Sequence, residues 1–374
     1  MPQFETLAFH IGYPKTSTTA IQEYLARNTD ELERHGWCYF GGEILGEYVG
    51  INAMVLMWTL TGGRGEQKLP GHLDHEPLLV ELFHRWLQQQ RAKNLLISAE
   101  ALCSFDENRW RQVMKAMEPY CSPETRIRVL HVVRHPLARA LSGRNQQLKV
   151  TGNLAKHHMP GIGRRKTNEL SIFFKNFFED RRYQFEVRRF EDLRDEHLEL
   201  GFLRWLGLPT ENFDTTAPKK TINSSVSLET KWIFTTAGSL EHGTWDYKFW
   251  QALRDFPGTK DGWQEEEARA RWASFADGEN SYLASVGLKM YAFEEGFRPM
   301  HLEQLWPEAF CDAWKKRLET LSRAHVKRML AVLQNLQPEV EPGEWPEEAR
   351  GRFERLKRVT WKRAYLPKVF RRRM

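Results

Sequence analysis

The sequence contains few cysteines. Only Cys38, Cys103, Cys121 and Cys311 occur in 374 residues, and no Cys-x-x-Cys pair is among them. A disulfide framework or a structural zinc site needs cysteines at closer and paired spacings. We therefore expect buried, reduced thiols and no metal ion.

Long apolar runs are also missing. No window approaches the ~18 consecutive apolar residues of a transmembrane helix. The first residues, MPQFETLAFHIG, lack the basic segment and long apolar stretch of a secretory signal. The expected location is therefore the cytoplasm. Hydrophobic residues make up 41% of the chain, which is enough for a packed core and argues against disorder.

Positive charge is concentrated at one end of the chain. Residues 352–374 hold ten Lys or Arg and one Glu, whereas the remainder has 45 basic and 48 acidic residues. Trp361, Tyr365 and Phe370 interleave with these cations, as in interfacial membrane anchors. Peripheral contact of 352–374 with the inner membrane surface is one hypothesis, and a solvated basic end is the other. No recognised nucleic-acid module accompanies the charge, so no specific nucleic acid is expected.

Short apolar runs alternate with helical patterns along the first part of the chain. Alternation of this kind predicts an α/β fold with a central parallel sheet flanked by helices, and ligands at the carboxyl ends of the strands. The predicted strands are 5–12, 95–98, 126–133 and 183–187, and helical patterns cover 18–36, 135–149 and 197–209.

The domain organisation follows from composition. We expect an α/β domain over 1–299, a helical, Trp-rich extension over 300–337, and a Pro/Glu/Gly linker with a basic, aromatic-containing tail over 338–374. Residues 150–168 are Gly-rich, basic and without periodicity, which predicts a long functional surface loop.

The end of the first predicted strand has the composition of an anion-binding loop. The strand ends at Gly12, and a helix begins within Thr16, Ser17, Thr18 and Thr19. Helix N–H groups, hydroxyls and the Lys15 ammonium are suited to phosphate or sulfate oxygens. Lys15 follows Gly12 by only three residues, which differs from the Walker spacing of ATP and GTP binders. A Ser/Thr-capped helix with a solvated Lys15 is the alternative interpretation.

At these residues the chain resembles the bacterial branch of the sulfotransferase family. HIGYPKTSTTAIQEYL is similar to the family's phosphosulfate loop, although Ser17 stands where its commonest form has Gly. In VVRHPLARALSGRNQ, Arg134 and Ser142 match residues that bind the 3'-phosphate of the donor in the family. Taken alone, Arg134 is compatible with an ion pair at the end of a strand, and Ser142 with an ordinary helix residue.

Three further segments support the resemblance, which spans residues 4–293: FEVRRFEDLRD with FLRWLGLP, KKTINSSVSLE, and RARWASFADGENSYLA. The second matches a loop that closes over the donor. Its secondary candidates are Lys219, Lys220, Asn223 and Ser225, and the alternative is a solvated turn with a helix cap at Ser227.

The resemblance implies a P-loop-like sulfotransferase fold, with 3'-phosphoadenosine-5'-phosphosulfate as donor and no metal. The enzyme would transfer the sulfuryl group to an acceptor hydroxyl or amine. The basic loop favours a saccharide or glycoconjugate, and steroid-like, phenolic and peptide acceptors are the alternatives. Lys15 would balance charge on the oxygen that bridges phosphorus and sulfur, while Thr16, Ser17, Thr18, Thr19 and the loop N–H groups would hold the 5'-phosphate.

The general base is open on sequence grounds. Glu100 follows an apolar strand, so it is either the base or a Glu that stabilises a helix N-terminus. Glu43 and Glu47 are runners-up. His10 and His131 lie in apolar strands and are expected in the core. His157 and His158, in the basic loop, could reach an acceptor.

Two other functional classes remain as alternatives. A nucleotide-dependent kinase would need Walker spacing and Mg²⁺ ligands. A non-catalytic anion- or membrane-binding protein on a degenerate sulfotransferase fold would not need an intact Lys15, Arg134 and Ser142.

Overall fold

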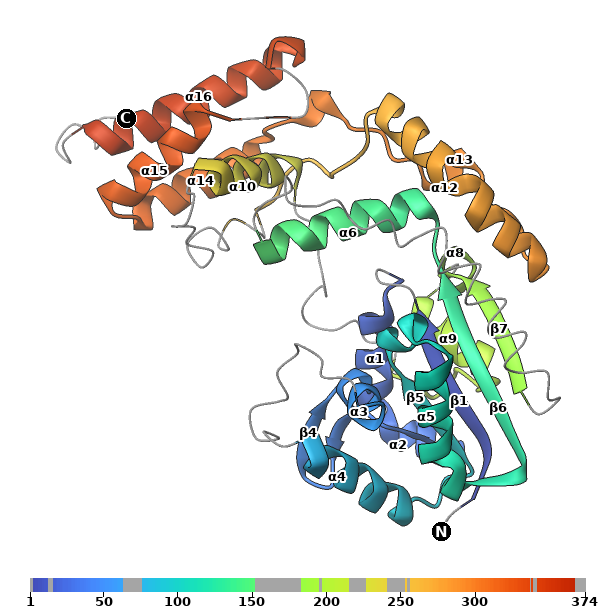
Figure 1. The fold of residues 1–374 in the computed structure, drawn as a ribbon. Helices are drawn as coiled ribbons and strands as arrows, with labels where there is room; N and C mark the ends of the chain where they lie inside the picture. Colours follow the sequence, from blue (N-terminus) through green and yellow to red (C-terminus); the bar gives the residue numbers. More distant parts are fainter. Residues whose placement is uncertain are drawn as a thin grey trace. The chain divides into compact units, whose positions relative to one another are not determined.

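The chain forms two compact units, each assembled from separate stretches. The computed structural model describes residues 3–12, 16–62, 76–151, 183–194, 197–214, 227–240, 253, 256–336, 338 and 342–366 (Figure 1). Contacts place Met1–Arg139, Ile162–Ile222 and Phe275–Tyr291 in unit 1, and Ala140–Gly161, Asn223–Ser274 and Ala292–Met374 in unit 2. These stretches interleave along the chain.

Unit 1 contains a five-stranded parallel sheet in the order β2-β5-β1-β6-β7. The α/β class and the central parallel sheet predicted from the sequence are confirmed. Four strands had been predicted, and β2 is too short to give a periodic signal. The strands are β1 (Phe4–Gly12), β2 (Trp37–Tyr39), β5 (Asn94–Ser98), β6 (Cys121–Val133) and β7 (Tyr183–Arg189).

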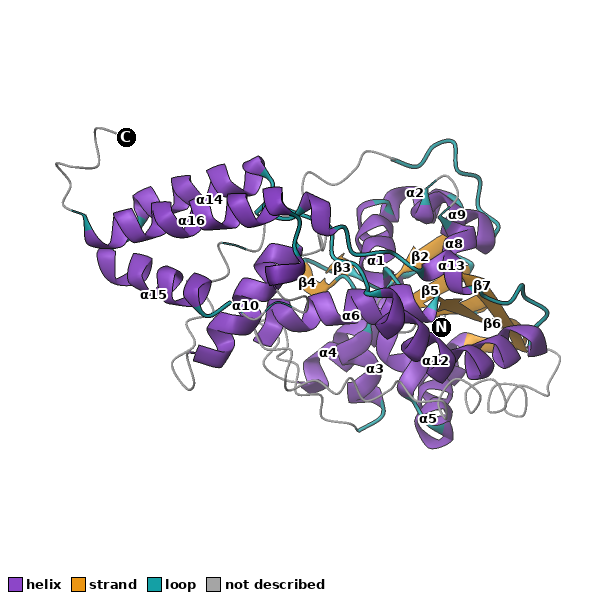
Figure 2. Ribbon diagram, turned by 90° about the horizontal axis from the view of Figure 1, so that it is seen from above, coloured by secondary structure: helices purple, strands orange, loops and turns teal. Residues whose placement is uncertain are grey.

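Helices cover both faces of this sheet (Figure 2). On one face, Ala8, Leu130 and Val132 belong to a buried cluster with residues of α1 (Thr18–Arg27), α2 (Thr29–Arg34), α8 (Phe190–Leu193) and α9 (Leu198–Leu206). On the other, Phe9 packs edge-on against Trp110 of α5 (Glu107–Met117), with 5.4 Å between ring centroids. Burial on both faces explains the continuous apolar strand sequences.

The remaining elements of the first 120 residues surround the sheet. They are the antiparallel pair β3 (Gly42–Ile44) and β4 (Glu47–Gly50), the helices α3 (Met54–Leu60) and α4 (Glu76–Gln89), and the 3-10 turns η1 (Glu100–Ser104) and η2 (Glu118–Tyr120).

The single helical pattern predicted over 18–36 is two helices, because Asn28 ends the first. Its amide Nδ2 donates to the Tyr24 carbonyl at 2.9 Å, and its Oδ1 accepts from the backbone N–H of Asp214 at 3.0 Å. These bonds fix a non-helical backbone at Asn28 (φ −110°, ψ 25°). Apolar periodicity continues through the break, which is why the sequence pattern does not reveal it.

The strand register brings the carboxyl ends of three strands to one edge. His10 of β1 lies opposite Ser98 of β5 and Leu130 of β6, and Gly12 lies opposite Val132. η1 begins directly after β5, and α6 (Pro136–Thr151) begins directly after β6, with Pro136 in its first turn as predicted. The chain leaves this edge at Gly12, Glu100 and Arg134.

Unit 2 is helical and has an aromatic core. Trp232 of α10 (Leu228–Leu240) stacks on Trp345 at 5.5 Å between centroids, and Trp306 stacks on Phe353 at 4.8 Å. Other elements of this part of the chain are α12 (Glu265–Ser285), which is divided between the units, α13 (Phe293–Gly296), η3 (Leu302–Gln304), α14 (Glu308–Thr320), α15 (Arg323–Gln334), η4 (Pro342–Glu344) and α16 (Glu347–Tyr365).

The described part of the basic tail is a packed helix. Phe353, Leu356 and Thr360 of α16 are buried, and the Trp314 indole N–H donates to the Thr360 hydroxyl at 3.0 Å. The apolar residues of α16 follow helical spacing, but the surrounding charges obscure it in the sequence.

The described helices do not include one that is long and apolar enough to cross a membrane. All four cysteines are free thiols; Cys38, Cys103 and Cys311 are buried as expected, whereas Cys121 is partly exposed.

Candidate active site

The predicted anion-binding loop is closely packed where the chain leaves β1. Thr16 and Thr18 are buried against Gly12. A Cβ atom at Gly12 would lie 2.5 Å from Thr16 Oγ1 and 2.7 Å from Thr18 Cγ2, so the position has no room for a side chain. The residues between, Tyr13 to Lys15, lie outside the described part of the chain.

Ser17 has a backbone conformation that favours glycine. It precedes the first turn of α1 with φ 60° and ψ 27°, in the left-handed region. A side chain there costs roughly 1–2 kcal/mol relative to the right-handed region. This is the position at which the family that the loop sequence resembles most often has Gly. Despite the strain, the Ser17 carbonyl accepts the Ala20 N–H at 3.0 Å and begins the helix.

Thr18 connects the loop to Glu100. The Thr18 hydroxyl donates to Glu100 Oε2 at 3.1 Å, across 82 positions of sequence. Thr18 is in the first turn of α1, and Glu100 is the first residue of η1, directly after β5. Glu100 is partly buried. The structure therefore places a carboxylate beside the hydroxyl-rich N-terminus of α1. At this position Glu100 is compatible with both roles considered for it, the general base and the stabilisation of a helix N-terminus.

Buried hydrogen bonds at Ser98 fix this arrangement. The Ser98 hydroxyl lies 2.8 Å from His10 Nδ1 and accepts from Gln22 Nε2 at 3.0 Å. It thereby joins β5 to β1 and to α1, two residues before Glu100. Burial lowers the pKa of His10 to about 3, so this imidazole is neutral at physiological pH. Neither Ser98 nor Gln22 is among the site residues predicted from the sequence, although Ser98 is the last residue of the predicted strand LLIS.

Arg134 lies at the same edge of the sheet, directly after β6. Its guanidinium carbon is 4.7 Å from the centroid of the Phe190 ring. Glu191 anchors the next residue, because its Oε1 accepts the His135 N–H at 3.1 Å and its Oε2 accepts the Tyr291 hydroxyl at 3.4 Å. A planar guanidinium is suited both to contact with an aromatic face and to paired hydrogen bonds with a phosphate.

The elements at this edge suit an anionic ligand and a proton acceptor together. The first N–H groups of a helix have no acceptor within it and carry partial positive charge. Thr16, Ser17, Thr18 and Thr19 surround that end of α1, with Thr19 partly exposed. Arg134 adds a full positive charge, and Glu100 adds a group able to take a proton.

The other predicted site residues are elsewhere or outside the described residues. Ser142 is partly buried in α6, in the part assigned to unit 2. Glu43 and Glu47 are exposed on the β3–β4 pair. Ser227 caps α10, since its hydroxyl accepts the Thr230 N–H at 3.3 Å, as one interpretation of that segment predicted. The residues outside the described ranges are Lys15, His157, His158, Lys219, Lys220, Asn223 and Ser225.

His131 is a core residue, as expected. Its Nδ1 lies 3.0 Å from the Tyr282 hydroxyl, and burial lowers its pKa to about 3. It is therefore not placed to act as a base on a bound acceptor.

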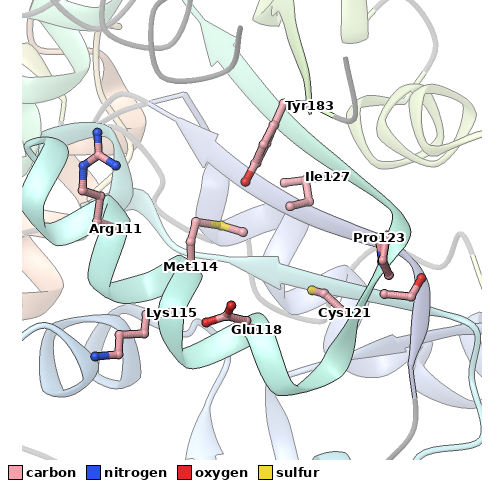
Figure 3. A pocket seen from close by; sticks show the side chains of 9 residues that line it. Arg111, Met114, Lys115, Glu118, Cys121, Pro123, Ile127 and Tyr183 are labelled. Carbon is pink, nitrogen blue, oxygen red and sulfur yellow. The ribbon is translucent and has the colours of Figure 1, made fainter. Parts of the chain in front are cut away.

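A pocket of about 530 Å³ lies elsewhere in unit 1 (Figure 3). It is lined by Met114 of α5, by Cys121 and Ile127 in the first half of β6, and by Tyr183 at the beginning of β7. The candidate site is at the opposite, carboxyl ends of these strands, so this pocket is not part of it.

Unit 2 contains a buried charged cluster that the sequence did not indicate. Asp261 Oδ1 accepts from Lys231 Nζ at 3.2 Å and from Arg144 at 3.0 Å, and Asn145 donates to Oδ2 at 3.4 Å. These hydrogen bonds join α6, α10 and the segment before α12, and so hold these three parts of unit 2 together. Among the residues that the structure describes, no group of His, Cys, Asp or Glu is arranged to hold a metal ion.

Comparisons of this chain with protein-family models, with curated proteins and with solved structures found no match.

Proposed function

We propose that this protein is a sulfotransferase that moves the sulfuryl group of 3'-phosphoadenosine-5'-phosphosulfate to an acceptor hydroxyl or amine. The observation that carries the proposal is the bond between Thr18 and Glu100, in the loop whose sequence resembles the phosphosulfate loop of that family. It joins the anion-binding end of α1 to a carboxylate at the carboxyl edge of a parallel sheet, where such folds bind ligands.

Two groups of residues would hold the donor, one at its 5'-phosphosulfate and one at its 3'-phosphate. Thr16, Ser17, Thr18 and Thr19, with the first N–H groups of α1, suit the 5'-phosphate and the sulfuryl oxygens. Arg134 suits the 3'-phosphate because a planar guanidinium can donate two parallel hydrogen bonds to it. Ser142, Lys220 and Asn223 are further donor-binding residues by the resemblance alone.

The chemical step is an in-line displacement at sulfur. The acceptor oxygen forms a new O–S bond while the bond from sulfur to the bridging oxygen breaks, and adenosine 3',5'-bisphosphate leaves with the electron pair. Lys15 balances the charge that grows on the bridging oxygen. Glu100 takes the acceptor's proton.

A saccharide or glycoconjugate is the acceptor class that the basic residues of 150–168 favour, because their cations suit polyhydroxyl or acidic groups.

The decisive experiment is calorimetry of the chain with adenosine 3',5'-bisphosphate. We expect binding, and a loss of at least about tenfold in affinity for Arg134→Ala, the usual effect of removing a charged hydrogen-bond partner. Arg126→Ala is the matched control, since Arg126 is exposed in the first half of β6, the strand that Arg134 follows. Absence of binding, or equal affinity in Arg134→Ala, would overturn the assignment.

Transfer of radiolabelled sulfate to a panel of acceptors then tests catalysis. Binding of the bisphosphate without transfer to any acceptor would favour the non-catalytic alternative. Preference for ATP with Mg²⁺ over the bisphosphate would favour a kinase.

A further inference from the structure

The outer face of α16 carries exposed aromatic and basic side chains together. We use this name for Arg358, Trp361, Lys362 and Tyr365, which lie on the side of α16 opposite its buried residues Phe353, Leu356 and Thr360. All belong to unit 2.

Trp361 and Tyr365 are exposed although the unit has an aromatic core. Trp361 is 47% and Tyr365 is 52% exposed, whereas Trp232, Trp306, Trp314 and Trp345 are at most 2% exposed. The two outer rings are one helical turn apart, with 5.7 Å between their centroids. Exposed apolar area of this kind is costly in water, and its concentration at one place indicates a surface with a partner.

The charge beside these rings is mainly positive. Three Lys or Arg lie in α15 and five lie between Arg355 and Leu366, and neither stretch contains Asp or Glu. Lys327 of α15 lies beside the aromatic pair, with its Nζ 5.1 Å from the centroid of the Tyr365 ring. Arg323 of α15 donates to the Leu366 carbonyl at 3.0 Å, which fixes α15 against the end of α16.

We propose that the outer face of α16, with Lys327, docks on the surface of a bilayer that contains anionic lipids. Trp and Tyr take the depth of the lipid headgroups, where one end of the side chain is apolar and the other is wet, and Lys and Arg beside them contact the headgroup phosphates. This face is the outward side of a helix, whereas proteins that bind single-stranded nucleic acid place stacking rings within a charged groove. The surface is therefore better suited to a membrane.

The docking surface is a property of α15 and α16 as folded, which determines how it must be tested. Ending the chain near Gly351 would remove Phe353 and Leu356 from the core of unit 2 and unfold it. Point substitutions on the outer face leave the buried residues in place.

Sedimentation with vesicles tests the aromatic contribution. The full chain is expected to bind vesicles of phosphatidylcholine with phosphatidylglycerol, and to bind phosphatidylcholine alone much more weakly. Trp361→Ala with Tyr365→Ala is expected to reduce binding to the anionic vesicles by at least about tenfold. Tyr48→Ala is the matched control, because Tyr48 is 53% exposed in unit 1; it is expected to bind as the unaltered chain does.

A charge reversal tests the electrostatic contribution. Arg358→Glu with Lys362→Glu is expected to reduce binding to the anionic vesicles by at least about tenfold, and added salt is expected to weaken binding of the unaltered chain. Lys93→Glu with Arg111→Glu changes the net charge equally at exposed positions of unit 1, and should leave binding intact.

The result that overturns the proposal is unchanged vesicle binding by the Trp361→Ala, Tyr365→Ala chain, or no binding of the unaltered chain to anionic vesicles. A variant that ends at Leu366 tests the terminal residues. If this variant loses vesicle binding while the aromatic variant keeps it, the membrane contact belongs to the terminus, and this result also overturns the proposal. Tighter binding of an RNA oligonucleotide than of vesicles, lost in the same aromatic variant, would replace the membrane by nucleic acid.

Discussion

The hydrogen bond between Thr18 and Glu100 depends on three other residues, each of which acts in a different way. Gly12 allows the loop side chains to approach the end of β1, Ser17 turns the chain through a left-handed conformation, and Ser98 fixes the end of β5. The Thr18 hydroxyl can donate either to Glu100 or to an anion, so ligand binding and the orientation of Glu100 are linked through one hydrogen atom.

Replacing Glu100 separates its two possible roles. Glu100→Gln keeps an oxygen that can accept from Thr18 but cannot take a proton, so we expect kcat to fall by about 10²–10⁴. Affinity for adenosine 3',5'-bisphosphate should be maintained, since a negative charge is removed near an anion. Steady-state kinetics with calorimetry measures both. A variant with normal kcat would leave Glu100 only its role at the start of η1.

Gly12 is the residue at which the loop is most sensitive to size. Gly12→Ala would force the Thr16 and Thr18 side chains aside, so we expect a loss of about 1–3 kcal/mol in the free energy of unfolding and weaker bisphosphate binding. Denaturant unfolding and calorimetry give the two quantities. Gly278→Ala in α12 is the control: its new Cβ meets nothing within 4 Å, and it should stabilise by up to about 1 kcal/mol. Equal behaviour of the two variants would contradict the close packing at Gly12.

At the scale of elements, α16 gives unit 2 both part of its core and its exposed aromatic face. The same helix buries Phe353 and Leu356 and exposes Trp361 and Tyr365. Trp345, just before α16, fixes its approach by stacking on Trp232 with 6° between the ring planes and by packing against Phe353 with 5.3 Å between centroids. The helix thus depends on tertiary contacts rather than on its own highly charged sequence.

Trp345→Ala should therefore destabilise the protein by about 3–5 kcal/mol, the usual cost of emptying a buried Trp site. Trp361→Ala removes the same side chain from an exposed position and should change the free energy of unfolding by less than about 0.5 kcal/mol. Chemical denaturation followed by circular dichroism distinguishes them. Similar losses in both variants would mean that Trp361 is also part of the core.

Elements also show where sequence patterns were informative. The four predicted strands are long or strongly apolar, and the prediction of α6 used Pro136 at a helix start. The sequence did not predict the break at Asn28, because it depends on a hydrogen bond to Asp214 far along the chain. It did not predict β2 either, because this strand depends on pairing with β5. The residues near Asn28 and β2 in the sequence do not indicate either of these distant partners.

At the scale of the molecule, two buried imidazoles make stability depend on pH. Burial lowers the pKa of His10 and of His131 from 6.5 to about 3. Between these pH values the unfolded chain binds protons that the folded chain does not, so stability is present above about pH 6.5 and is lost as pH falls toward 3. Glu229, whose pKa burial raises, contributes a slope of opposite sign.

We expect each histidine to contribute a slope to the free energy of unfolding that rises from about 0.7 kcal/mol per pH unit at pH 6.5 to about 1.4 near pH 5, before most carboxylates titrate. His131→Gln should reduce the total slope by about that amount, while the contribution of Glu229 cancels in the comparison. Urea unfolding of both chains at several pH values provides the test. Parallel pH profiles would show that His131 is protonated in the folded protein or remains neutral in the unfolded one.

The sequence by itself determined the α/β class, the parallel sheet and the hydroxyl-rich loop after the first strand, because apolar periodicity and Ser/Thr clustering are local properties of the chain. It also supplied the resemblance on which Lys15, Arg134 and Ser142 depend. Only the tertiary structure decided that Glu100 accepts from Thr18, that Ser98 joins three elements, and that the basic segment 347–365 is a packed helix. These depend on strand register and on contacts between residues far apart in sequence, where the geometry is set by packing and not by neighbouring residues.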